Sequence, residues 1–296
     1  MYLSVKEVAI KWNLSQRSVR NYCAKGCVEG SYLQGKVWLI PIDAKKPQRK
    51  NSQAEKRDNL LRILQSEQKN KISGGIYHKI QVDLTYNSNH IEGSKLSHDE
   101  TRYIFETNTI GSGEVHSVDD IIETANHFRC IDMVIAHATS QLCERFIKQL
   151  HSVLKSGTSD SRKDWFAVGG YKKLPNQVGG KNTTSPAETE SAMADLISAY
   201  NNKSEIAFED IVQFHHDFEC IHPFQDGNGR IGRLIMFKEC LKQNIVPFII
   251  SDEHKMYYYR GLNQWETERG FLLETCGFAT DVFKTYLDYF EVPYKK

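Results

Sequence analysis

The chain has 296 residues, 40% of them hydrophobic and 25% charged, which is an ordinary balance for a globular protein and enough length for two or three domains. No apolar run approaches the ~18–20 residues of a membrane span, and charged residues stand where a signal peptide has its apolar core, so we expect a cytoplasmic protein without a membrane partner. The net charge is +1, but residues 1–50 hold ten bases and three acids, a local net charge of +7 that leaves −6 for the rest. Such asymmetry suggests a basic nucleic-acid module attached to something else.

Residues 1–47 have the pattern of a small helix-turn-helix domain. Ser4 and Glu7 form a capping box ahead of a helix with apolar residues at helical spacing. After a turn, Ser15 caps a second helix, and Gly26 is suited to end it. Two short helices in succession are therefore predicted at the N-terminus.

The stretch that follows, "GSYLQGKVWLIP", alternates around Gln34-Gly35 like a hairpin, which would be a wing. The arrangement resembles the excisionase-like and MerR-like winged helix-turn-helix domains, and this implies DNA as a partner, with the second helix in the major groove. A small helical protein-interaction domain is the alternative, because helix-turn-helix shapes are reused for other functions. The expected DNA-reading residues lie off the apolar face of the second helix: Gln16, Arg17, Ser18, Arg20 and Asn21.

Residues 48–74 are polar and charged, and they are interpreted as a linker running into a helix. From there to the C-terminus the pattern is almost entirely helical, including a helix that begins with a capping box at Ser117 and Asp120. The exception is residues 169–188, whose glycines, prolines and β-formers predict a short hairpin or flap between helices.

The stretch "HPFQDGNGR", residues 222–230, carries the most chemistry. Its Asp-Gly-Asn-Gly-Arg portion predicts a tight loop leading into the helix "RIGRLIMFKECLK". Glycines allow backbone N–H groups to point into one concavity, and a helix N-terminus adds the positive end of its dipole. Together they make an anion site suited to phosphate.

Four side chains complete this site. Arg230 and Arg233 lie one turn apart on the same face, and each offers phosphate oxygens a planar fork of donors. Asp226 is a natural hard ligand for Mg²⁺ among phosphates. His222 precedes the loop, where a neutral imidazole can take a proton from an attacking hydroxyl. These groups are suited to the transfer of a phosphorus-centred group.

Residues 222–233 match HPF-x-(D/E)-GNGR-x-x-R at every defined position, and the chain resembles a Fic-domain protein over roughly residues 75–290. The resemblance implies a mostly α-helical core with a β-hairpin flap beside the active site. It also implies a protein adenylyltransferase, an enzyme that moves AMP from ATP onto a hydroxyl side chain of a target protein.

By this resemblance, His222 deprotonates the target's Ser, Thr or Tyr hydroxyl, and Asp226 binds a Mg²⁺ ion that bridges the α- and β-phosphates. The other motif residues are expected to bind phosphates, with the β-phosphate at Arg230, the γ-phosphate at Arg233, and a backbone anion cradle at Gly227, Asn228 and Gly229.

Two further stretches fit the resemblance. Val178 and Gly179 lie where the family has its flap, whose edge can pair with an extended target segment. Tyr258 and Tyr259 resemble the family's nucleoside-binding helix, although tyrosines at this spacing are equally often plain core. Glu266 stands where some members have an asparagine, a departure that affects one nucleotide contact.

Residues 76–92 read as a helix closed by Gly93, with Ser88 and Glu92 four apart on one face. A solvated acid at a helix end is one interpretation. The pattern S-x-x-x-E-G also resembles the family's inhibitory motif, which implies that Glu92 pairs with Arg233 and keeps it from the γ-phosphate. A second possibility is that Glu92 positions water to remove AMP from a modified target.

Two alternatives to AMP transfer are open. In the first, the protein is a DNA-binding regulator that uses its Fic part as a nucleotide sensor, although the intact His222 and Asp226 argue against an inactive enzyme. In the second, another group is transferred, although the intact Gly-Asn-Gly core and second arginine favour AMP over phosphate. The target protein is not identified by the sequence, and the chain itself is one candidate. A homo-oligomer is also left open.

Overall fold

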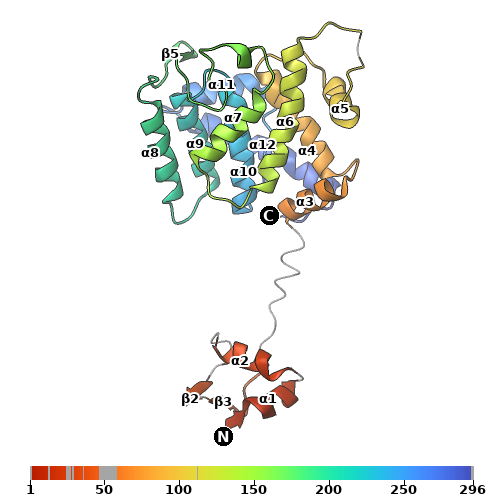
Figure 1. The fold of residues 1–296 in the computed structure, drawn as a ribbon, viewed down its shortest axis with the longest axis vertical. Helices are drawn as coiled ribbons and strands as arrows, with labels where there is room; N and C mark the ends of the chain where they lie inside the picture. Colours follow the sequence, from red (N-terminus) through yellow and green to blue (C-terminus); the bar gives the residue numbers. More distant parts are fainter. Residues whose placement is uncertain are drawn as a thin grey trace. The chain divides into compact units, whose positions relative to one another are not determined.

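The computed structural model of the chain describes residues 2–12, 14–24, 28, 30–35, 37–46, 59–111 and 113–294. The chain divides into two compact units, Met1–Glu55 and Lys56–Lys296. Each unit has its own hydrophobic core. The mostly helical fold predicted from the sequence is confirmed (Figure 1). Gly26, expected to end the second helix, and residues 48–58 of the expected linker lie outside the described residues.

The first unit combines two helices with a three-stranded antiparallel sheet of order β1-β3-β2. Its elements are β1 (Tyr2–Ser4), α1 (Val5–Trp12), α2 (Gln16–Ala24), β2 (Tyr32–Gln34) and β3 (Val37–Pro41). The hairpin around Gln34-Gly35 is formed by β2 and β3, with Gln34 opposite Val37. The strand β1 was not predicted, because three residues are too few to show an alternating pattern.

Both predicted helix starts in this unit are formed. Glu7 accepts a hydrogen bond from the Ser4 N–H at 2.8 Å, and the Glu7 N–H donates to Ser4 Oγ at 3.4 Å, which is the expected capping box. The Ser18 N–H donates to Ser15 Oγ at 3.1 Å. These local bonds hold the apolar faces of α1 and α2 over the sheet, where they form the small core of the unit.

The second unit is a bundle of helices with one small hairpin (Figure 1). Its elements are α3 (Leu60–Asn70), α4 (Ile76–Ile91), α5 (His98–Thr107), α6 (Val118–Ala136), α7 (Glu144–Leu154), η1 (Asp160–Arg162), β4 (Gln177–Val178), β5 (Lys181–Asn182), α8 (Thr189–Asn201), α9 (Phe208–Ile221), α10 (Asn228–Gln243), η2 (Asp252–His254), α11 (Lys255–Asn263) and α12 (Gly270–Tyr289). Among the described helices, none has the length and apolar character needed to cross a membrane.

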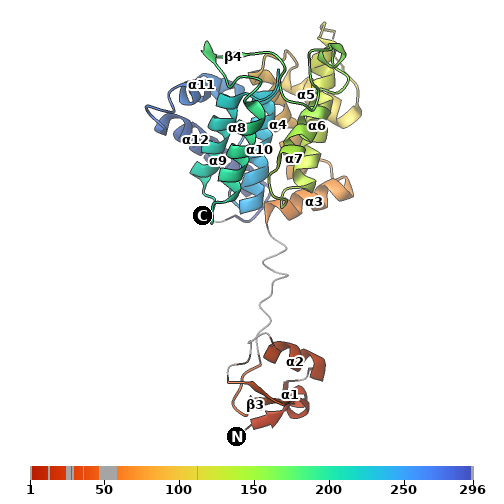
Figure 2. The ribbon, with the colours of Figure 1, turned by 60° about the vertical axis from the view of Figure 1, so that its left-hand side comes forward.

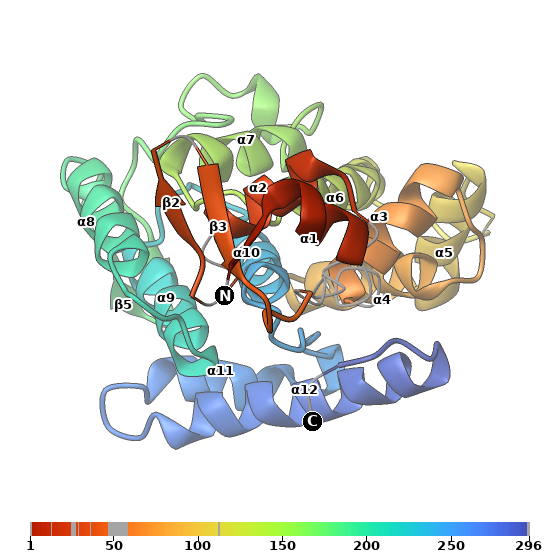
Figure 3. The same cartoon turned by 90° about the horizontal axis from the view of Figure 1, so that it is seen from below.

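The helix α10 is the centre of this unit. It is buried almost throughout, from Asn228 to Leu241, because α4, α6, α7 and α9 pack around it. Figure 2 shows α8, α9 and α10 side by side, and Figure 3 shows α11 running along α12. A helix buried on all sides is fixed in position, so its N-terminus, which carries the glycine loop, is a rigid point in the fold.

Two helix ends differ from the sequence prediction. Ser117 does precede α6, but its side chain makes no cap hydrogen bond. The expected capping box is wrong because Asp120 instead accepts the Lys95 N–H at 3.2 Å. The predicted helix 76–92 ends one residue early, at Ile91.

Candidate active site

The loop after α9 is closed by its own side chains. His222 ends α9 in the left-handed region, with φ 50°, and its N–H donates to the carbonyl of Phe218 at 2.8 Å. Phe224 is fully buried, as expected for an anchor of the loop. The Asn228 side chain accepts the Phe224 N–H and donates to the Phe224 carbonyl, both at 2.8 Å. The side chain of Asn228 therefore closes the loop, which leaves its backbone N–H as the group available to an anion cradle.

Two glycines of the loop stand where a side chain would be unfavourable, one because of its backbone conformation and one because of a close neighbour. Gly227 has φ 83°, a left-handed conformation that favours glycine, and α10 begins directly after it. A side chain at Gly229 would collide with the Glu92 carboxylate. The carboxylate thus lies against the first turn of α10, where the helix dipole attracts anions.

The predicted inhibitory residues meet the second arginine of the motif. Arg233 Nη2 is 2.6 Å from Glu92 Oε1, and the same guanidinium donates to Ser88 Oγ at 3.0 Å and to the Ser88 carbonyl at 2.9 Å. The Arg233 side chain is only 4% exposed. In this structure its charge is therefore committed to α4.

The end of α4 is held firmly where it meets this arginine. Gly93 has φ 99°, and the Ser94 N–H donates to the carbonyl of Asn89 at 3.1 Å, which forms a Schellman closure. The Tyr259 hydroxyl donates to the carbonyl of Ile91 at 3.0 Å. Glu92 is the C-cap residue of this fixed end.

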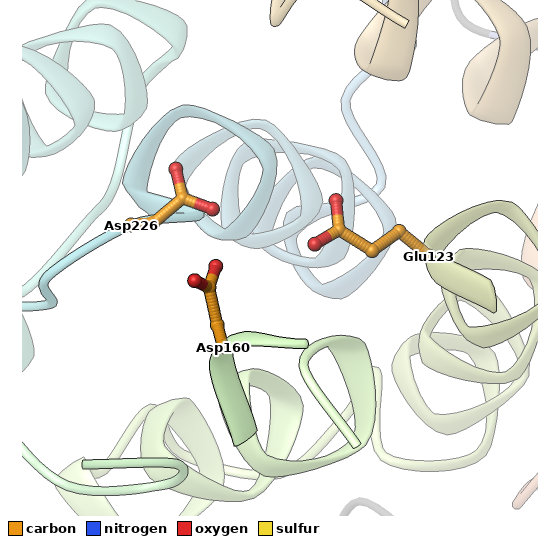
Figure 4. Close-up of side chains that lie close together, drawn as sticks. All are labelled: Glu123, Asp160 and Asp226. Carbon is orange, nitrogen blue, oxygen red and sulfur yellow. The ribbon is translucent and has the colours of Figure 1, made fainter. Parts of the chain in front are cut away.

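Three carboxylates surround one ammonium group beside the loop. Lys155 Nζ lies 2.7 Å from Asp226 and 2.9 Å from Asp160, and it also contacts Glu123. Arg230 lies on the other side, 3.1 Å from Asp226 and in contact with Glu123. Figure 4 shows the three carboxylates directed toward a common space from α6, from η1 and from the loop before α10.

The charges in this cluster reinforce one another. Burial alone would raise the pKa of the Asp226 carboxyl, but Arg230 and Lys155 hold it well below its usual value. Burial alone would lower the pKa of Lys155, but Asp226 and Glu123 raise it. The oxygen atoms of Glu123, Asp160 and Asp226 lie within 4.8 Å of one another, and hard carboxylate oxygens are the ligands that Mg²⁺ prefers. The residues present therefore fit a magnesium ion.

His151 supports the loop from α7. Its ring stacks on Phe224 with centroids 4.0 Å apart, and its Nδ1 accepts the Gly169 N–H at 2.9 Å. Burial lowers the pKa of His151 to about 3, so the ring is neutral. Because Nδ1 is an acceptor, the proton is on Nε2, which lies 3.2 Å from the Asp226 carbonyl and donates to it.

The predicted hairpin is present as β4 and β5. Val178 is 39% exposed, and Gly179 has φ 55° in the turn. Lys181 at the edge of the hairpin donates to the carbonyl of Asn263, at the end of α11, at 3.2 Å. Val178 therefore lies on an accessible edge.

Lys172 ties the base of this hairpin to the segment around His222. Its buried ammonium donates to Asn176 at 2.8 Å, to Thr183 at 2.7 Å and to the carbonyl of Ile221 at 3.0 Å. Its backbone N–H donates to the carbonyl of Pro223 at 2.8 Å. The hairpin and the residues on either side of His222 are thus joined through the side chain and the backbone of Lys172.

The two tyrosines expected near a nucleoside have different environments. Tyr258 is 1% exposed, and its hydroxyl lies 2.6 Å from Nε2 of His215. The Tyr258 ring is thus part of the core in this structure, which was one of its two interpretations, and its place at a nucleoside stays a prediction. Tyr259 is 39% exposed, and Glu266 is also exposed.

In the first unit, the residues expected to read DNA lie on the open side of α2. Ser18 is partly buried, and the others are exposed: Gln16, Arg17, Arg20 and Asn21. The residues of α2 that pack into the core are Val19 and Cys23.

Several site residues were missed by sequence reasoning: Glu123, His151, Lys155, Asp160 and Lys172. Each comes from a segment distant in the chain from the motif, and no local pattern indicates which distant charges will meet.

Comparison with known proteins gives this arrangement a context. Residues 141–240 match the family model described as Fic/DOC family. The chain is 25% identical over 182 residues to protein adenylyltransferase Fic of Aedes aegypti, a match that covers 60% of this chain and 36% of that protein. It is 23% identical over 183 residues to protein adenylyltransferase fic-1 of Caenorhabditis elegans, with 60% and 35% covered. The match thus spans about a third of the length of these relatives.

Solved structures show the same fold. A Fic domain containing signaling protein from Bacteroides thetaiotaomicron superposes with a TM-score of 0.62 at 25% identity, covering 77% of this chain and 94% of the other. Fic-1 from Caenorhabditis elegans superposes with a TM-score of 0.62 at 19% identity, covering 78% and 72%, a likeness of fold alone. The second unit therefore contains a Fic domain, and the chain is homologous to proteins named protein adenylyltransferase Fic.

Proposed function

We propose that this protein transfers AMP from ATP to a Ser, Thr or Tyr hydroxyl of a target protein. One observation carries the proposal: His222 stands at the mouth of a loop that leads into the N-terminus of α10, with Arg230 and Arg233 on the first turns of that helix. A base, an anion-attracting helix end and two guanidinium groups are thus fixed on one rigid element. The relatives named protein adenylyltransferase support AMP as the group transferred.

In this proposal each residue has one task. His222 takes the proton of the target hydroxyl, whose oxygen attacks the α-phosphorus while diphosphate leaves. The backbone N–H groups of residues 227–229 and the Arg230 guanidinium hold phosphate oxygens. Mg²⁺ would be held by Asp226, with Glu123 and Asp160 near enough to add oxygen ligands, and would neutralise phosphate charge.

The contacts of Arg233 support an inhibited resting state. Glu92 holds Arg233 at 2.6 Å and lies against the first turn of α10. A γ-phosphate would need the same guanidinium, so ATP in this state would bind with its α-phosphorus displaced from the line of attack. Displacements of this kind cost about 100-fold or more in rate.

AMP transfer from α-labelled ATP with Mg²⁺ tests the proposal. The samples are the parent, Glu92→Gly, Glu92→Gly with His222→Ala, and Glu106→Gly, which removes a glutamate from α5 that pairs with His78 instead. We expect label on protein in the Glu92→Gly sample at about 100-fold the parent level, and none when His222 is also replaced. ATP labelled on the γ-phosphate should leave no label, which separates AMP transfer from phosphate transfer.

Other outcomes would point to the alternatives. ATP binding without label in any sample would favour a nucleotide sensor. Label from UTP in preference to ATP would favour transfer of another nucleotide. In a further assay the starting material is a target that already carries AMP. If the parent removes this AMP and Glu92→Gly does not, the result would favour removal of AMP with help from Glu92. The target is not identified, so the chain itself and any partner copy are tested first as acceptors.

We propose further that residues 1–47 bind duplex DNA. The support is the net charge of +7 on residues 1–50 and the exposed polar side of α2. A short helix with exposed basic side chains can enter the major groove of DNA, and basic side chains there can contact the flanking phosphates.

A gel shift of the full chain on a pool of random duplexes tests this second proposal. Binding should be present at 25 mM salt and should fall by at least about tenfold at 200 mM, because phosphate contacts release counterions. Arg17→Ala with Arg20→Ala should weaken it, whereas Arg62→Ala with Arg102→Ala in the second unit should not. Absence of binding at low salt would leave the protein-interaction alternative.

A further inference from the structure

We propose that Glu219 is a positioning residue for His222: it accepts the Nδ1–H of the ring and so keeps Nε2 free to take the proton of the attacking hydroxyl. The inference rests on the proposed function, because it takes His222 as the base.

The geometry places the two side chains together. Glu219 stands one turn before His222 on α9, and its Oε2 lies 3.5 Å from His222 Nδ1. The Glu219 side chain is 10% exposed and that of His222 is 17% exposed. Among the described residues, neither His222 Nδ1 nor Glu219 Oε1 has a hydrogen-bond partner in this structure. A small rotation of either side chain would bring donor and acceptor into hydrogen-bond range.

A carboxylate at this depth needs a partner. Burial alone would raise the pKa of Glu219, but His222, His215 and Arg233 hold it below its ordinary value, so it is ionised. Buried charges are normally paired or hydrogen-bonded. The question is which of these three neighbours provides the pairing.

The other two neighbours differ from His222 in charge or in contacts. Burial lowers the pKa of His215 to about 4, so this ring is neutral; its Nε2 lies 2.6 Å from the Tyr258 hydroxyl, and its Nδ1 has no hydrogen-bond partner among the described residues. Arg233 is bound to Glu92. His222 has the ring nitrogen that lies 3.5 Å from the Glu219 carboxylate, and its charge changes when a proton is transferred.

The neighbouring helix makes room for this arrangement. A Cβ atom at Gly232 on α10 would lie 3.1 Å from Glu219 Oε1 and 2.5 Å from His215 Nδ1. Glycine at this position lets the last turns of α9 approach α10 closely. Gly232 is not part of the phosphate loop, and packing of α9 against α10 gives it a function.

The chemical consequence concerns the proton and the tautomer. With Nδ1–H directed at Glu219, the lone pair of Nε2 is available to the hydroxyl proton. After the transfer, the imidazolium stands next to a carboxylate that remains ionised. The hydroxyl oxygen bonds to the α-phosphorus as the bond to the diphosphate leaving group breaks.

Ring ¹⁵N chemical shifts of His222 test the contact independently of activity. They are measured on the full chain labelled in histidine at pH 8.5, and His222 is identified by the signals lost in His222→Ala. We expect the Nδ1–H tautomer in the parent and in Glu209→Leu, a matched change at the exposed start of α9. In Glu219→Leu the Nε2–H tautomer should predominate.

Kinetics in the Glu92→Gly background provide the second readout. Glu219→Gln, which keeps the shape of the side chain, should lower kcat, expressed per mole of folded enzyme, by about 10²–10⁴-fold and leave the KM for ATP within about threefold. Unchanged kcat in Glu219→Gln would overturn the proposal, as would an unchanged tautomer in Glu219→Leu. If Glu92→Gly transfers no AMP at all, the proposed function fails, and the tautomer measurement still decides whether Glu219 orients His222.

Discussion

The Lys155 ammonium is the residue-scale feature on which the charge balance of the site depends. It is 2% exposed and touches Glu123, Asp160 and Asp226. Carboxylates this close repel one another unless a cation lies between them. In this structure the ammonium is that cation, and a divalent ion would compete with it for the same oxygens.

Lys155→Met should therefore lower the unfolding free energy and increase the stabilisation that Mg²⁺ provides. Without Mg²⁺ we expect a loss of unfolding free energy on the order of 3 kcal/mol, as when one partner of a buried ion pair is removed. Mg²⁺ at about 10 mM, which stabilises a state that binds it by mass action, should raise the melting temperature of the variant more than that of the parent. Lys148→Met, which removes a partly exposed partner of Glu144, is the control. Equal responses to Mg²⁺ in the parent and in Lys155→Met would contradict the prediction.

At the scale of elements, the sequence was informative for most features that local bonds hold together. The capping box at Ser4, the cap at Ser15 and the loop that opens α10 connect residues at most four apart, and the structure contains all three. The S-x-x-x-E-G pattern led to the contact between Glu92 and Arg233 through a family resemblance, because no local rule relates α4 to α10.

The failures at this scale have one physical cause. Asp120 is near enough to cap α6 but is drawn to a backbone N–H of another segment. The sequence left Tyr258 open between a nucleoside contact and the core, and its ring is buried where it stacks on His215 of α9. The same limit applies to Glu123, whose meeting with Arg230 depends on how α6 lies along α10. The spacing of apolar residues predicts which face of a helix is buried, but it does not predict which other element covers that face.

At the scale of the whole molecule, the second unit buries several neutral histidines. Burial lowers the pKa of His127 and of His151 to about 3 and that of His215 to about 4. The corresponding value in an unfolded chain is about 6.5. Between these values the unfolded chain binds protons that the folded chain does not, so stability falls as pH falls below about 6.5.

The melting temperature of the second unit should accordingly be lower at pH 5 than at pH 7. Each of the three histidines contributes about 2 kcal/mol to the difference. His216 opposes it in part: burial alone would lower its pKa, but Asp217 and Cys220 together outweigh burial and raise the pKa to about 9. Calorimetry of the full chain measures the shift. In His127→Leu the shift should shrink by about a third, whatever the absolute stability of the variant, and an unchanged shift would refute the assignment.

The three hydrogen bonds of Lys172 have a consequence for target choice. They fasten the base of the β4–β5 hairpin to the segment that carries His222, so the two move as one mechanical part. Under the proposed function, a target strand that pairs with the hairpin edge would be held at a fixed distance from His222. Because side chains alternate across a strand, only residues on one face of that strand would then present a hydroxyl to His222.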